Sequence, residues 1–465
     1  MSRNISRQKL PDFMLKGAGI GVIGLVSVTL PGAAFGQNAG EAGVTFDLSL
    51  GQTFEATDNA SLQDPADGEF RSITSISGDL ASTTRSQQLT LGFTLGVELG
   101  DDDFELGTTG VDASFTRFGQ TSEFGIEGNY FRRRIESATF TILDELGDEL
   151  DITVTEGTRV DYAYGVRYEF GQNAPFTGQL RARQAFREFE TDSTAAFDSR
   201  STNLDADFGL ELDPATQLTF GTAYSNRDED DDEDTYREQY DFGLGLGRDL
   251  SETDRIAFRG TYRTGDVTSG IGAARSTSDF EGFGGSLSFN RSLRNGEFRV
   301  SASRQVNEGG TVDDLRLGRS IDFPAARLDL DGGVILSDGE VLPAIRVGYT
   351  RDAPAGQIRL SLNQRSGLNS DDETVLNTIG SASYNQTINA LSSVGLSVSL
   401  ASQSVVGGDD TTNRLNAGAS YNRTIARDFG LTAGYRYALI SETGTDDRSS
   451  NTVFVTLSRN FSIRQ

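Results

Sequence analysis

The sequence predicts an all-β fold, a transmembrane antiparallel up-and-down β-barrel of about 22 strands within a range of roughly 18 to 24. From residue 44 to residue 461 the chain repeats a unit of roughly ten residues, alternating apolar with polar or small, followed by turn residues. A tilted strand needs about 9 to 11 residues to cross a bilayer. The 429 residues after residue 36 would hold about 21 or 22 strands at roughly 20 residues per strand and connection, and barrels of this type have an even number.

The alternation is clear in residues 159–170, 204–212 and 358–363. Side chains that alternate with a period of two lie on opposite faces of a strand, whereas a helix of 3.6 residues per turn would mix them. One face is therefore expected to contact lipid and the other the water-filled lumen. We expect Val166, Leu210 and Leu360 on the lipid face. We expect Arg167, Asp207 and Arg359 on the lumen face.

The first 36 residues are predicted to be a secretory signal peptide. Four basic residues precede an apolar stretch at 17–30, and a small-residue cleavage site ends at Gly36. A membrane anchor, the alternative, would need about 20 apolar residues. We therefore expect residues 37–465 to form the outer-membrane barrel, without a plug domain.

The composition excludes several kinds of chemistry. The first 36 residues hold four basic residues and one acid, so residues 37–465 carry 37 Lys+Arg against 67 Asp+Glu, a net charge of −30. These residues include no Lys, Met, His, Cys or Trp. Without Cys and His there is no thiol nucleophile, no Ser-His pair and no soft metal site. We predict that the protein is not an enzyme, with no catalytic residue, no cofactor and no metal site.

Short connections rich in Gly, Pro, Asn and Asp alternate with longer ones. The short set is expected at the periplasmic end: 119–122, 172–176, 213–216, 249–254, 292–296, 324–326, 352–356, 387–390 and 425–428. The long set is expected outside the cell: 136–157, 191–199, 228–235, 265–277, 367–373, 404–411 and 441–450. For this alternation to hold from end to end, residues 70–81 and 88–99 must be separate strands joined around Thr84 and Arg85.

A water-soluble all-β repeat protein, such as a propeller or a solenoid, is the alternative to a membrane barrel. Its sheets would bury one face and carry sharper repeat motifs. The apolar face here instead places aromatic residues near strand ends, as in the aromatic girdles of membrane interfaces; they are Tyr384, Tyr421, Phe429, Tyr435 and Tyr437. This distribution favours the membrane barrel.

The signal peptide, the alternation and the last strand, residues 451–461, together resemble a Gram-negative outer-membrane β-barrel of the porin-like kind from a proteobacterium. In such proteins the last strand resembles a signal for barrel assembly, in which every second residue is apolar and the final residue of the series is aromatic. Val453, Val455, Leu457 and Phe461 match this pattern, but Arg459 interrupts it and four residues follow Phe461. The resemblance implies the outer membrane as location and the barrel assembly machinery as a partner.

The resemblance also implies a pore constriction, because general porins fold their third extracellular loop into the lumen opposite an arginine ladder. Residues 136–157 would be that loop, with acids at Asp144, Glu145, Asp148 and Glu149. The facing arginines would be Arg159, Arg167, Arg181, Arg183 and Arg187. Opposed charges across a narrow pore would orient polar solutes. The alternative is a hairpin that stands above the membrane, because apolar residues flank residues 144–148 symmetrically.

The acidic run 228–234 suggests divalent cations, which carboxylate oxygens bind well. It lacks the ligand spacing and central Gly of a calcium loop, so a solvated external loop is the favoured interpretation.

Passive or semi-selective diffusion of small hydrophilic solutes is the first functional hypothesis, because it needs only a wide polar lumen. A TonB-driven receptor also has 22 strands but fills its lumen with a large N-terminal plug, and only residues 37–43 precede the first strand. An export-associated or envelope-structural barrel, for example a polysaccharide exit, stays open. Expected partners are outer-membrane lipid, lipopolysaccharide and small polar solutes, with no nucleic acid. A barrel of this size favours a monomer over a trimer.

Overall fold

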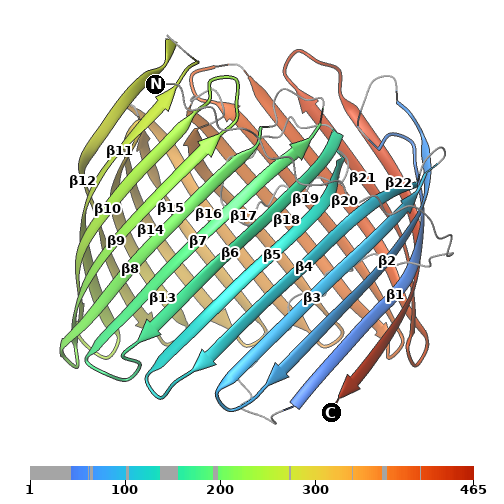
Figure 1. The fold of residues 1–465 in the computed structure, drawn as a ribbon, viewed down its shortest axis with the longest axis horizontal. Coiled ribbons are helices and arrows are strands. Elements are labelled where there is room, and N and C mark those ends of the chain that lie inside the picture. Colours follow the sequence, from blue (N-terminus) through green and yellow to red (C-terminus); the bar gives the residue numbers. More distant parts are fainter. Residues whose placement is uncertain are drawn as a thin grey trace, which may run out of the picture.

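The computed structural model describes residues 43–60, 62, 66–100, 104–136, 156–191, 197–271, 274–337, 339–368, 374–408 and 410–464. These residues form one closed antiparallel sheet of 22 strands (Figure 1), which confirms the predicted fold and strand number. Each strand pairs with its neighbours in sequence, and the first strand pairs with the last. The predicted signal peptide lies outside the described residues. The described part of the chain contains no helix long and apolar enough to cross a membrane.

The strands are steeply tilted (Figure 1) and 12 to 18 residues long. They are β1 (Gly43–Thr57), β2 (Glu69–Thr83), β3 (Gln87–Leu99), β4 (Phe104–Phe118), β5 (Ser122–Glu136), β6 (Glu156–Phe170), β7 (Phe176–Glu190), β8 (Ser199–Asp213), β9 (Thr216–Glu229), β10 (Tyr236–Asp249), β11 (Asp254–Ser269), β12 (Ser276–Leu293), β13 (Gly296–Asn307), β14 (Gly310–Phe323), β15 (Ala326–Ser337), β16 (Glu340–Ala353), β17 (Gly356–Leu368), β18 (Thr374–Asn389), β19 (Ser392–Val405), β20 (Thr411–Ala426), β21 (Phe429–Glu442) and β22 (Arg448–Arg464). Because about 9 to 11 residues cross a bilayer, the strand ends extend beyond it.

The two faces of the sheet separate apolar from polar side chains as expected. Val166, Leu210 and Leu360 lie on the outer face, each 39 to 44% exposed in the isolated chain. They lie beside other outer-face apolar residues, as Leu360 does opposite Tyr349. Asp207 lies on the inner face, where its carboxylate is 3.7 Å from the guanidinium of Arg259. Exposed apolar side chains therefore form the lipid-facing surface.

We predict that single cysteines at Arg167, Asp207 and Arg359 react with a membrane-impermeant maleimide in reconstituted protein, because these positions line the water-filled lumen. Cysteines at Val166, Leu210 and Leu360 should stay unlabelled, because lipid covers them. The protein after residue 36 has no native cysteine, so each label reports one site. Equal labelling of the two sets, measured by gel shift, would contradict the assignment of the faces.

The predicted division of residues 70–99 into two strands is confirmed, because β2 and β3 are joined by residues 84–86. The longer connections lie at one end of the barrel, which in outer-membrane barrels is the extracellular end. Two connections at that end are nevertheless only two residues long: 308–309 and 338–339. The expected loop 265–277 also shortens, because β11 continues to Ser269 and β12 begins at Ser276. The short/long alternation therefore fails between β12 and β17, where all five connections are two residues long because strand pairing extends further than the turn residues suggested.

The two departures of the last strand from the assembly pattern have structural explanations. The guanidinium of Arg459 lies 4.9 Å from the ring centroid of Phe429 and 4.5 Å from that of Phe461. Such cation–π contacts let a charged side chain lie against an aromatic surface. The residues after Phe461 continue β22, since Arg464 still pairs with Thr45.

Buried hydroxyl groups line the inside of the contact between β1 and β22. Thr53 and Thr456, 1% and 4% exposed, share a hydrogen bond of 2.8 Å between their hydroxyls. The hydroxyl of Thr57 lies 3.1 Å from those of Ser450 and Thr452. These hydrogen bonds supplement the backbone ladder, so the first and last strands are joined on their inner face by side chains as well.

Candidate functional site in the barrel lumen

All five arginines of the predicted constriction lie on the inner face of two adjacent strands. Arg159 and Arg167 belong to β6, and Arg181, Arg183 and Arg187 belong to β7. In both strands the odd-numbered residues lie on the inner face, and all five arginines have odd numbers. Arg167 lies directly opposite Arg181. The opposing acids Asp144, Glu145, Asp148 and Glu149 lie outside the described residues, so the constriction itself stays a prediction.

Asp161 gathers three of the inner-face arginines near the extracellular end of β6. Its carboxylate accepts from Nε of Arg159 at 2.8 Å and from Nε of Arg187 at 3.3 Å, and a guanidinium nitrogen of Arg133 lies at 3.8 Å. Arg159 is only 5% exposed. Burial of a guanidinium requires such a partner. Arg159 therefore belongs to the wall of the barrel and does not offer its charge to a passing solute.

The other three predicted arginines are more accessible. Arg167 donates to Glu123 and lies 3.6 Å from Glu169. Arg183, whose side chain is 40% exposed, lies 3.6 Å from Glu127. Arg181 is exposed and lies between Arg167 and Asp205 in the strand register. The inner wall is thus a mixed surface of both charges, and Arg181 and Arg183 are accessible cations with no carboxylate of the described residues at hydrogen-bond distance.

A second group of charges, which the sequence prediction did not include, lies on β9 and β10. Glu229, 3% exposed, accepts from Nε of Arg227 at 2.7 Å and from Arg237. The period-two alternation of β9 places Ser225, Arg227 and Glu229 on the inner face. Continuing this alternation past residue 227 in the sequence would have predicted the same. The sequence interpretation instead began an external loop at residue 228, whereas β9 continues to Glu229.

The rest of the acidic run forms a turn. The carboxylate of Asp231 accepts from the backbone N–H of Glu233 at 3.2 Å, from the N–H of Thr235 at 2.9 Å and from the Thr235 hydroxyl at 2.7 Å. Within the described ranges, no group of three or more acidic side chains has the geometry of a metal site. The run therefore has a local structural role in closing the β9–β10 connection.

The tip of the β13–β14 hairpin leans over the inner wall. The pairing of β12 with β13 ends at Gly285 and Arg304, so the last residues of β13 leave the wall. The backbone carbonyl of Val306 accepts from Arg263 of β11 at 3.0 Å. The carboxylate of Glu308 accepts from Nε of Arg237 of β10 at 3.0 Å. Since Arg237 and Arg263 lie on the inner face, these bonds place the tip in the lumen.

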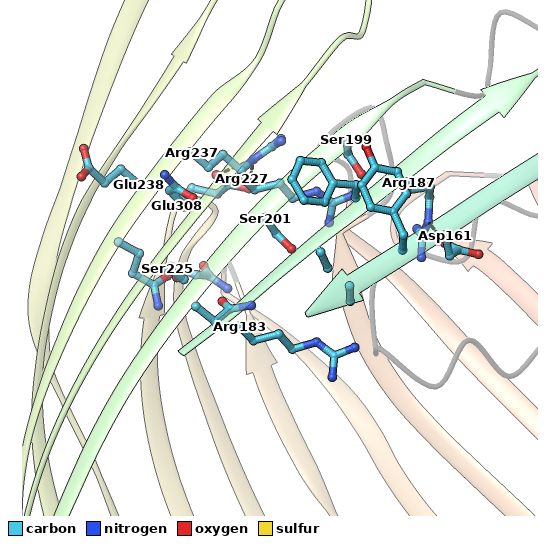
Figure 2. A pocket seen from close by; sticks show the side chains of 18 of the residues that line it. Asp161, Arg183, Arg187, Ser199, Ser201, Ser225, Arg227, Arg237, Glu238 and Glu308 are labelled. Atoms are coloured by element: carbon cyan, nitrogen blue, oxygen red, sulfur yellow. Dashed lines mark hydrogen bonds and ion pairs between the residues drawn. The ribbon is translucent and has the colours of Figure 1, made fainter. Parts of the chain in front are cut away.

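A cavity of about 450 Å³ lies between this tip and the wall, at the extracellular end. Figure 2 shows Arg183, Arg187, Ser199, Ser201 and Ser225 gathered around it from three strands. The inner-face residues that line it are Asn129, Asp161, Ala163, Arg183, Ala185, Arg187, Ser199, Ser201, Asn203, Ser225, Arg227, Arg237, Gln239, Phe280 and Asn307, together with Glu308 of the hairpin tip. The cavity combines guanidinium groups and carboxylates with hydroxyls and amides, which can bind a charged polar solute.

Glycines allow one arginine to lie flat against the wall below the cavity. Arg259 of β11 reaches across β9 and β10 toward Asp207 of β8. A Cβ atom at Gly221 would lie 2.4 Å from its guanidinium, and one at Gly243 would lie 2.7 Å from it. Any larger residue at these two positions would push Arg259 into the lumen.

A separate buried network joins β1, β2 and β21. The carboxylate of Glu55 accepts from Arg71 at 2.8 Å, and both side chains are 5% exposed. Glu55 also accepts from Arg436. Glu69 and Glu98 lie 3.6 Å and 3.9 Å from Arg71. At its centre Glu55 and Arg71 are buried and paired with each other, so we assign the network to the stability of the barrel.

The barrel is similar to several solved structures. A ferric enterobactin receptor (PfeA) mutant from Pseudomonas aeruginosa, in complex with enterobactin, has a TM-score of 0.57 at 10% identity, covering 90% of this chain and 82% of that chain. The copper transporter OprC has a TM-score of 0.59 at 12% identity, covering 91% and 81%. The siderophore receptor PirA from Acinetobacter baumannii has a TM-score of 0.55 at 7% identity, covering 90% and 80%.

The fold is that of a Gram-negative outer-membrane barrel. The resemblance found in the sequence thus holds at the level of the barrel, whereas the matched structures are receptors and a transporter. At 7 to 12% identity the likeness concerns the fold alone. No protein-family model matches the chain, and no curated protein matches it in sequence.

Proposed function

We propose that the protein is an outer-membrane channel through which small hydrophilic solutes diffuse passively or semi-selectively. The observation that carries this proposal is the inner wall of the closed 22-stranded barrel, which is lined by charged, hydroxyl and amide groups. Barrels with 16 or more strands are wide enough to enclose an aqueous channel. Every described residue belongs to a strand or to a connection between two strands, which supports the proposal.

Planar-bilayer conductance of the refolded full-length mature protein tests this function. An open channel gives steps of ionic current that increase with salt concentration. A barrel that inserts, shifts on a gel after heating and yet carries no current would overturn the proposal, and would favour the export-associated or envelope-structural alternative.

The accessible arginines predict a measurable ion selectivity. Replacing Arg181 and Arg183 together with Ser should shift the reversal potential in a salt gradient toward cation preference, because two cations are lost from the inner wall. The effect should fade at about 1 M salt, where the Debye length is only about 3 Å. A matched control replaces Arg304 and Arg423, which lie on the outer face, with Ser. An equal shift in the control pair would show that net charge, and not the lumen position, sets selectivity.

A further inference from the structure

The row of residues at the floor of the cavity is continuous across four strands. Arg183 of β7 lies directly opposite Asn203 of β8, Asn203 lies opposite Ser225 of β9, and Ser225 lies opposite Gln239 of β10. Adjacent strands lie about 4.8 Å apart, so the row spans roughly 14 Å. It presents one cation at one end and neutral polar groups along the rest.

Two of these neutral groups have unused hydrogen-bonding capacity. The side chains of Asn203 and Ser225 are half-buried, and neither bonds another side chain in the described part of the chain. The amide of Gln239 donates to Asp241 at 2.6 Å and keeps its other N–H. An amide and a hydroxyl each both donate and accept, which matches the hydroxyl groups of a polyol.

The charge at the end of the row is also available. The carboxylate of Glu127 lies 3.6 Å from Arg183, beyond the length of a good charge-assisted hydrogen bond. Glu127 reaches Arg183 only across Gly165, the residue that separates them on β6. A planar carboxylate on the lumen side could accept two parallel bonds from the guanidinium. The neighbouring Arg187, Arg227 and Arg237 also line the cavity, and each is paired with a carboxylate, from Asp161, Glu229 or Glu308, that holds its guanidinium in place.

We propose that this cavity is a binding site for a small polyhydroxylated anion of the sugar-acid class. The carboxylate of the solute lies on Arg183, and its hydroxyls contact Asn203, Ser225 and Gln239. The tip of the β13–β14 hairpin, held by the Arg237–Glu308 ion pair, covers the site from the lumen side. The inference rests on the proposed function, since it assigns that channel a preferred solute class.

The test is isothermal titration calorimetry on the full mature barrel, refolded in detergent, with D-glucuronate as the probe. Glucose supplies the hydroxyls without the charge, and acetate supplies the charge without the hydroxyls. Glucuronate should bind at least about tenfold more tightly than either, because only it satisfies both ends of the row. Absence of glucuronate binding, or equally tight binding of glucose or acetate, would overturn the proposal.

Variants locate the site. Arg183→Gln should weaken glucuronate binding by about tenfold and leave glucose unaffected, whereas Arg183→Lys should retain part of the affinity. Asn203→Ala with Ser225→Ala should weaken glucuronate while acetate is unchanged. Arg359→Gln, on the inner face of β17, is the matched control and should bind as the wild type does. If Arg183→Gln folds, as judged by its heat-dependent gel shift, and binds glucuronate normally, the site is not the one described.

Calorimetry and conductance separate the two proposals. A protein that conducts ions but does not bind glucuronate retains the channel function and loses this site. A protein that binds glucuronate through Arg183 but carries no current has the site without passive diffusion.

Discussion

Deletion of residues 451–465 is expected to abolish the accumulation of folded barrel in the outer membrane. These residues form most of β22, which pairs with β1 from Thr45 to Thr57 and with β21 from Phe429 to Ile440. Without β22 two strand edges face lipid, where each unpaired backbone N–H or C=O costs several kcal/mol. The loss over two edges far exceeds the roughly 5 to 15 kcal/mol by which proteins of this kind are stable.

Heat-modifiable protein in outer-membrane fractions measures this effect. Phe461→Ala should lower the level partially, because it removes an aromatic ring at the end of β22 and the contact with Arg459. Phe461→Tyr keeps an aromatic ring at this position and serves as the control. A normal amount of heat-modifiable protein after the deletion would show that the barrel closes through another strand.

Glu55→Ala is expected to cost about 3 kcal/mol in the free energy of unfolding. The substitution leaves Arg71, 5% exposed, without its 2.8 Å partner and removes the acceptor of Arg436. Loss of one member of a buried ion pair costs about 3 to 5 kcal/mol, because the remaining charge stays desolvated. Glu69 and Glu98 remain near Arg71, so the lower end of the range applies.

Urea titration of the protein in lipid vesicles, followed by its heat-dependent gel shift or tyrosine fluorescence, measures the change. Asp47→Ala is the matched control, because Asp47 is another inner-face carboxylate of β1 that lies opposite Asp79, a like charge. Its removal should leave stability unchanged or slightly higher. An unfolding midpoint for Glu55→Ala equal to that of the wild type would contradict a stabilising role of the network.

The period-two alternation was sufficient to predict the strands and their faces, because both depend on neighbouring residues only. It placed Arg181 and Arg183 on the inner face. The division of β2 from β3 came instead from the expected alternation of short and long connections. It could not place Glu308 beside Arg237, because the two are 71 residues apart. Their contact depends on the departure of β13 from the wall after Arg304. That departure follows from the stagger and curvature of the strands, so no pattern among neighbouring residues in the sequence predicts it.

The same limit explains Arg459. The sequence showed a charge on an apolar stripe, which indicates a defect in the assembly pattern. The structure shows two aromatic rings, from β21 and β22, beside its guanidinium. One of these rings is 30 positions away in the chain, so the compensation appears only once the register of β21 and β22 is known.

The hydroxyl contacts between β1 and β22 bear on the order in which the barrel folds. Twenty-one of the strand pairings join consecutive segments of the chain, but Thr53 and Thr456 are 403 residues apart. Loop-closure entropy makes such a contact about 3 kcal/mol more costly to form than a hairpin of roughly 20 residues. Ring closure is therefore the last and least favourable step of assembly. The buried hydroxyls strengthen the one pairing that chain connectivity does not promote, and the Glu55–Arg436 bond joins β1 to β21 across β22.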